Sequence, residues 1–145
     1  MEELFELKSF VEQGKYSEAL TLIGEMEEMG RDDKINKIES FFEILLLHLI
    51  KIDAENRTTR SWEVSVRNAV RAILRSNKRR KAGGYYLSEL ELMDMINDAY
   101  EAALDRASLE AFEGMFDMVE IARKVREKDL KKKALEMVLE AQNQN

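Results

Sequence analysis

The chain has 145 residues, a formal net charge of −6 and 45% hydrophobic residues, enough to fill one hydrophobic core. Because proline is absent and strong helix formers are abundant, we expect a single all-α domain, residues 1–145, rather than a β or disordered protein. The lack of cysteine excludes disulfides and zinc ribbons, and with no signal-peptide or membrane-spanning pattern we expect a cytoplasmic protein.

The first predicted elements are a helical hairpin, residues 1–30, and a long apolar helix, residues 33–54. Ser17 is the expected N-cap of the second hairpin helix, Gly30 its expected end, and Asp32 the expected cap of the apolar helix. The second half of that helix is apolar on nearly every side. We therefore expect it to be either the central helix of a bundle of five to seven helices or the seam of a homodimer.

The next predicted helix spans about residues 61–81, with Ser61 as its cap and Gly83 and Gly84 after its end. Its segment of the chain is strongly basic. From Arg57 to Tyr86 there are nine basic residues and one acid, whereas the other residues include 14 basic and 28 acidic ones.

Two capping boxes predict the start of the remaining helices. Ser88 with Glu91 opens a fifth helix, and Asp117 with Glu120 opens a C-terminal helix over residues 117–142. Acidic side chains share a narrow arc of the fifth helix, opposite its apolar face. They are Glu91, Asp94, Asp98, Glu101 and Asp105.

The basic residues of the fourth helix form a stripe about 130° from its apolar face. If the fourth and fifth helices pack through their apolar faces, the acidic arc points away from this stripe. Mutual neutralisation inside the molecule is the alternative. The candidate binding residues are Arg60, Arg67, Arg71, Arg75, Lys78, Arg79, Arg80, Lys81, Tyr85 and Tyr86.

Two classes of partner fit this basic surface. An acidic protein, bound in the manner of an antitoxin or an adaptor, would meet the arginines through its carboxylates. A nucleic acid would meet them through phosphates, with Tyr85 and Tyr86 available for base stacking. Because the rest of the chain is acidic and repels a polyanion, we prefer the protein partner, and we expect no membrane binding.

The sequence offers little for catalysis. His48 is the only histidine and lies on the most apolar helix, where we expect a neutral ring that is hydrogen-bonded inside the core. One histidine and no cysteine cannot make a transition-metal site, and the glycine pair at 83–84 lacks the lysine of a phosphate loop. We therefore expect no catalytic residues, no metal and no cofactor.

Several motifs carry a family resemblance. ILLLHLIK at residues 44–51, RSW at 60–62, and NKRRKAGGYYLS at 77–88 resemble the bacterial domain-of-unknown-function family twenty-nine, most closely its cyanobacterial members. The likeness covers about residues 4–112, with a family-like core at 33–107. It implies an all-helical fold but no activity. It also implies that the family's signature positions, which we interpret as a packing constellation, are His48, Lys51, Arg60, Ser61, Trp62 and Arg67.

Overall fold

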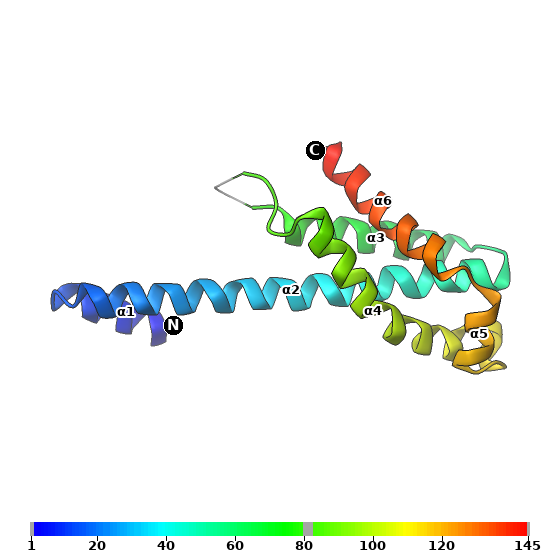
Figure 1. Cartoon of the computed structure of the whole chain (residues 1–145), viewed down its shortest axis with the longest axis horizontal. Coiled ribbons are helices and arrows are strands. Elements are labelled where there is room, and N and C mark those ends of the chain that lie inside the picture. Colours follow the sequence, from blue (N-terminus) through cyan, green and yellow to red (C-terminus); the bar gives the residue numbers. More distant parts are fainter. Residues whose placement is uncertain (1, 80–82, 145) are drawn as a thin grey trace. The chain divides into compact units, whose positions relative to one another are not determined.

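The computed structural model describes residues 2–79 and 83–144, and it confirms the predicted all-α class (Figure 1). These residues form six α-helices and one short 3₁₀ helix. The helices are α1 (Glu2–Glu12), α2 (Tyr16–Glu55), α3 (Arg60–Asn77), α4 (Glu89–Glu110), α5 (Met118–Lys124) and α6 (Glu127–Asn143), and the 3₁₀ helix is Ala111–Gly114. None of the described helices is long and apolar enough to cross a membrane.

The contacts within the chain divide it into two units, residues 1–36 and 37–145. In the first unit, α1 and the beginning of α2 form a helical hairpin, and the turn between them uses Gly14 at a φ of 73°. Its interior is small. Ala19 and Leu22 are the buried residues of α2 in this unit, and α1 has no buried residue.

The predicted helix boundaries around Gly30 are wrong. No helix ends at Gly30, Ser17 lies inside the first turn of α2, and Asp32 lies in its middle. Gly30 keeps a negative φ. A glycine inside a helix costs only about 1 kcal/mol relative to alanine, which favourable neighbours easily offset.

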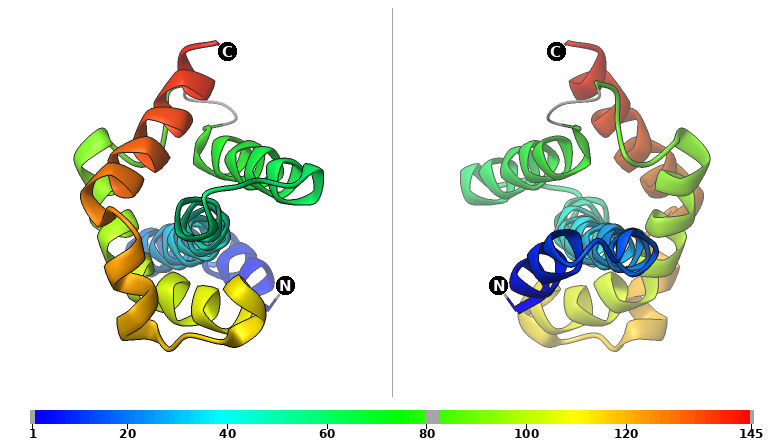
Figure 2. Two further views of the ribbon diagram at one scale, coloured as in Figure 1. Left: turned by 90° about the vertical axis from the view of Figure 1, so that its right-hand side faces the viewer. Right: turned by 90° about the vertical axis from the view of Figure 1, so that its left-hand side faces the viewer.

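The second unit is built around the later part of α2, which Figure 2 shows end-on among α3, α4 and α6. This part of α2 supplies five of the largest fully buried side chains, more than any other helix, so its apolar residues fill the core of their own chain. The others come from α3, α4, α5 and α6. These side chains include Ile38, Phe42, Leu45, Leu46 and Ile50 of α2, and Ile73, Leu92, Ile96, Ile121 and Val138 around it.

α3 differs from its predicted bounds at both ends. Thr59, not Ser61, is the N-cap, because its hydroxyl accepts a hydrogen bond from the Trp62 backbone N–H at 3.1 Å. The helix ends at Asn77, four residues before the predicted end. There the buried Asn77 side chain turns the chain by accepting a hydrogen bond from the Leu87 N–H at 2.9 Å.

Both predicted capping boxes are confirmed, at Ser88 with Glu91 and at Asp117 with Glu120. The single C-terminal helix predicted for residues 117–142 is wrong, because the chain is extended at Val125 and divides it into α5 and α6. The Arg126 backbone N–H donates to Asp53 Oδ2 of α2 at 3.0 Å, so a tertiary contact stabilises this break.

Candidate functional site

α3 carries a buried apolar face and an exposed basic face. Val66, Ala69 and Ile73 of this helix are buried, and at about 100° per residue the arginines between them point outward. The exposed basic residues, which we call the basic face, are Arg60, Arg67, Arg71 and Arg75 on the helix and Lys78 and Arg79 directly after it. Arg80 and Lys81 belong to the predicted surface but lie outside the described residues.

No carboxylate neutralises the basic face within the described residues. None of the ion pairs of this part of the chain includes one of its six side chains. Arg71 Nη1 donates to Asn68 Oδ1 at 3.5 Å, and the Arg79 guanidinium lies 5.5 Å from the centre of the Tyr86 ring. Since both partners are neutral, the positive charge of the face stays available to another molecule.

The acidic arc of α4 does not neutralise the basic face either. Asp94, Asp98, Glu101 and Asp105 are exposed on α4, while the residues between them, such as Ile96, are buried. No ion pair joins this arc to α3 in the described ranges. The acidic arc of α4 and the basic face therefore form separate surfaces.

A groove runs beside the basic face, between α3 and α6. Three adjoining hollows make it up. The first two share Val66, Arg67 and Met137, and the third adjoins one of them at Leu49 and Lys133. Its floor is apolar and contains Leu49 and Ile52 of α2, Val66, Val70 and Leu74 of α3, and Leu130, Met137 and Ala141 of α6. An apolar channel between two helices has the shape that receives a third helix.

The rim of the groove holds both signs of charge, and several of its charged side chains have no ion pair in the described part of the chain. Arg67, Arg71 and Lys133 line it with no ion pair among the described residues. The rim acids Glu63 and Glu140 are also unpaired there. With the other residues of the basic face alongside, positive charge prevails on the α3 side of the groove.

The two tyrosines of the predicted surface are held against the protein. The Tyr85 hydroxyl donates to the Gln142 carbonyl of α6 at 2.9 Å, and the Tyr86 N–H donates to the Asn77 carbonyl at 2.8 Å. Both side chains are half-buried. The loop after α3 is therefore pinned to α6, and its rings are not fully exposed for stacking.

The family's signature positions divide between the core and the surface. Lys51 and Trp62 come together, with Lys51 Nζ 4.7 Å from the centre of the Trp62 ring. Lys51 is buried, and its Nζ donates to Glu110 Oε1 at 2.9 Å. By contrast, Arg60, Ser61 and Arg67 are exposed.

Sequence reasoning missed two residues of this cluster. Arg57 places its guanidinium 4.7 Å from the Trp62 ring and donates through Nε to Glu55 Oε1 at 3.0 Å. Glu110, 59 positions after Lys51, provides the carboxylate that the buried ammonium requires. A lysine in a strongly apolar helix was the only signal that a distant acid had to exist.

His48 lies one turn before Lys51 on α2, in surroundings that favour its neutral form. Burial lowers the pKa of His48 below its usual value, the Lys51 ammonium and Arg106 lower it further, and only Glu110 acts in the opposite direction. Nδ1 is buried without a hydrogen-bond partner among the described residues. The surroundings therefore favour the neutral ring expected from the sequence, but the expected hydrogen bond is not made at Nδ1.

Acidification should therefore destabilise the fold through His48. Because the native pKa of His48 is lowered, the unfolded chain takes up its proton near pH 6.5 and the native state only at lower pH, so the free energy of unfolding falls as the pH falls through this range. Urea unfolding of the wild type and of His48→Gln, compared from pH 7.5 to 5.0, should show a steeper loss in the wild type. Parallel curves for the two proteins would contradict this.

Among the described residues, no three His, Asp or Glu side chains are grouped closely enough to hold a metal ion. No curated protein and no solved structure matches the chain. A family model described as "Domain of unknown function DUF29" matches residues 12–121, so the match begins about eight and ends about nine positions later than the likeness seen in the sequence. The chain therefore belongs to the DUF29 family.

Proposed function

We propose that the protein is a non-catalytic binding module whose groove between α3 and α6 holds an acidic amphipathic helix of a protein partner. One observation carries the proposal. An apolar groove lies directly beside a row of arginines that have no acidic partner among the described residues.

The two parts of the site would recognise two faces of such a helix. Apolar side chains spaced three and four positions apart would enter the groove over Val66, Val70 and Met137. Carboxylates on the flank of the helix would meet Arg67 and Arg71, since guanidinium groups bind carboxylates through two parallel hydrogen bonds. The same site would serve an adaptor or an antitoxin-like protein.

A nucleic acid is the alternative ligand of the same arginines, and the local chemistry favours it less. A phosphate backbone gains nothing from an apolar floor, and Glu63 and Glu140 on the rim would repel it. The bonds that hold Tyr85 to α6 also limit its use as a stacking platform.

The probe is a fluorescent, acidic, amphipathic helical peptide. Its leucines lie three and four positions apart on one face, and its glutamates lie on the flank. Binding is measured by anisotropy at low and high salt, with single-stranded RNA as a competing probe. The wild type should bind the peptide, and R67E/R71E should bind it at least tenfold more weakly because both rim cations are reversed. R123E/K128E is the matched control, since it reverses two exposed cations that do not line the groove.

Three results would overturn the proposal. The first is no peptide binding at low salt. The second is an equal loss in both charge-reversal variants, which would indicate attraction by overall charge. The third is RNA binding that depends on Arg67 and Arg71 in the absence of peptide binding, which would establish the nucleic-acid alternative.

A further inference from the structure

The N-terminal hairpin exposes an unusual amount of apolar surface. Of the twelve large hydrophobic side chains exposed in the described residues, seven lie in residues 1–36, and five lie in the much longer second unit. A hairpin whose first helix buries no residue has little core of its own. Exposed apolar side chains this concentrated are typical of an interaction surface.

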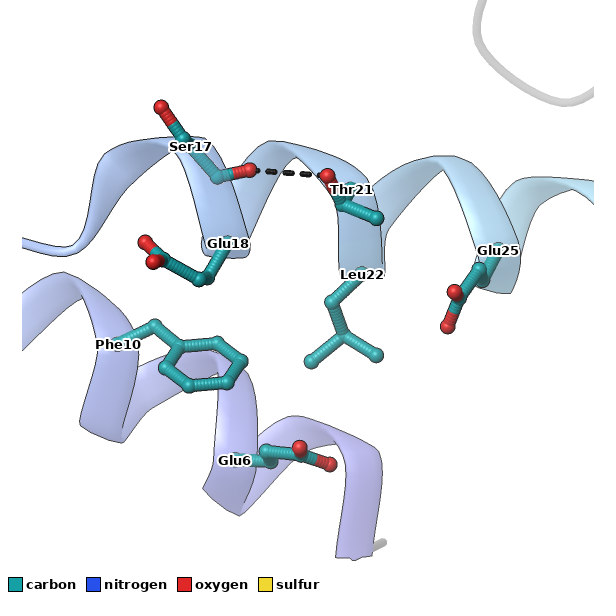
Figure 3. A pocket seen from close by; sticks show the side chains of 7 residues that line it. All are labelled: Glu6, Phe10, Ser17, Glu18, Thr21, Leu22 and Glu25. Atoms are coloured by element: carbon teal, nitrogen blue, oxygen red, sulfur yellow. Dashed lines mark hydrogen bonds between the residues drawn. The ribbon is translucent and has the colours of Figure 1, made fainter.

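The two sides of the hairpin differ in chemistry. Figure 3 shows one side, where Phe10 and Leu22 lie between the two helices and Glu6, Glu18 and Glu25 surround them. The helical repeat of about 100° per residue puts a set of exposed apolar side chains on the other side of both helices. This set, which we call the apolar row, is Leu4 and Val11 of α1 and Tyr16, Leu20 and Ile23 of α2.

The charge of the hairpin also differs from that of the second unit. Ten of the 29 acidic residues and four of the 23 basic residues lie in residues 1–36. This segment therefore carries the whole net charge of −6, and residues 37–145 carry equal numbers of both signs. Glu27 follows Tyr16, Leu20 and Ile23 on the same face of α2, and Glu12 directly follows Val11.

We infer that the apolar row of one chain docks in the groove between α3 and α6 of a second copy. The inference rests on the proposed function, since it assigns an occupant to the same groove. Tyr16, Leu20 and Ile23 have the i, i+4, i+7 spacing of a helix that lies in a groove. The acidic hairpin complements the unpaired Arg67, Arg71 and Lys133 of the rim.

The charges also select this mode over pairing of two hairpins. Two apolar rows packed against each other would bring two segments of −6 together, whereas in the groove the acidic segment that carries the row meets Arg67, Arg71 and Lys133. Each copy has one row and one groove, so a reciprocal exchange closes as a symmetric dimer. The two reciprocal contacts together bring the buried area closer to the about 1,200–2,000 Å² of a stable interface, so a dimer held by one contact is weaker than a dimer held by both.

Sedimentation velocity over a concentration series tests this with two separate variants. L20E/I23E changes only the apolar row, and R67E/R71E changes only the groove. All four positions are exposed, so circular dichroism should show an unchanged helix content. The wild type should be a dimer, and each variant should raise the dimer dissociation constant at least tenfold. Leu109→Glu, an exposed apolar residue of α4, should leave it unchanged.

Mixing the two variants gives the sharpest result. L20E/I23E keeps its groove and R67E/R71E keeps its row, so an equimolar mixture should form a 1:1 dimer through one intact contact. A mixture that stays monomeric overturns the inference, as does an R67E/R71E variant that still dimerises, which would indicate pairing of hairpins.

A wild type that stays monomeric also overturns the inference and leaves the proposed function to its own test. A monomer that binds the acidic peptide keeps the groove as a site for another protein. A monomer that does not bind the peptide refutes both proposals.

Discussion

Replacing Glu110 with alanine should lower the free energy of unfolding by about 2–3 kcal/mol. The reason is the Lys51 ammonium, whose side chain is only 6% exposed and whose Nζ lies 2.9 Å from Glu110 Oε1. Removing one partner of a buried pair leaves the other charge without compensation, which costs about 3–5 kcal/mol. Because the Glu110 side chain is 42% exposed, water can reach the vacated position, and we expect a smaller loss.

Replacing Lys51, the other partner of the ion pair, should lower the free energy of unfolding by less. Lys51→Met removes the charge and keeps an apolar side chain against Trp62, leaving Glu110 in partial contact with water, so we expect a loss of about 1 kcal/mol. The double variant K51M/E110Q should be more stable than Glu110→Ala alone. Glu101→Ala, an exposed acid on the same helix, is the control and should change stability by less than about 0.5 kcal/mol.

Urea unfolding monitored by circular dichroism measures all four variants. A Glu110→Ala variant as stable as the Glu101→Ala control would show that water or another acid serves Lys51 equally well. A Lys51→Met variant less stable than Glu110→Ala would place the stabilisation in the lysine stem and its contact with Trp62, not in the ion pair.

Replacing Asn77 with leucine should lower the free energy of unfolding by about 2–4 kcal/mol. Asn77 is completely buried, its Oδ1 accepts from the Leu87 N–H at 2.9 Å, and its Nδ2 donates to Gln142 Oε1 at 2.8 Å. Leucine satisfies neither group, and each buried polar group left unpaired costs about 1–3 kcal/mol. Without these two hydrogen bonds, the segment around Leu87 should also be held less firmly against α6.

Hydrogen exchange distinguishes this mechanism from general loosening of the core. In Asn77→Leu the Leu87 amide should exchange faster than amides in the middle of α4. Gln142→Leu removes one of the two bonds at a half-buried position and should cost about 1 kcal/mol. Asn68→Leu, at an exposed position of α3, should be close to neutral. Uniformly faster exchange in Asn77→Leu would contradict the proposed role.

Much of the fold was predictable because its signals are local. The capping boxes at Ser88 and Asp117 join residues three positions apart, so their hydrogen bonds form whatever surrounds them. The two faces of α3 follow from the helical repeat alone. The exposure of Arg67 and Arg71 was predictable for the same reason.

Boundaries failed where local preferences were nearly balanced. Gly30 costs too little to end α2, and Thr59 and Ser61 are both good caps, so the choice between them depended on where the chain turned after α2. The break between α5 and α6 depends on Asp53, which lies 73 positions before Arg126 in the chain. A pattern confined to a few neighbouring residues carries no information about such a contact.

The sequence by itself determined a helical chain, a basic face on α3 and the place of the only histidine in an apolar helix, because residue type and a period of 3.6 residues decide each of these. Only the tertiary structure decided that Glu110 pairs with Lys51, that Asn77 pins a loop to α6, and that α6 lies beside α3 to make a groove. The bonds of Lys51 with Glu110 and of Asn77 with Gln142 join residues 59 and 65 positions apart, and such contacts form only when the core around α2 brings their helices together.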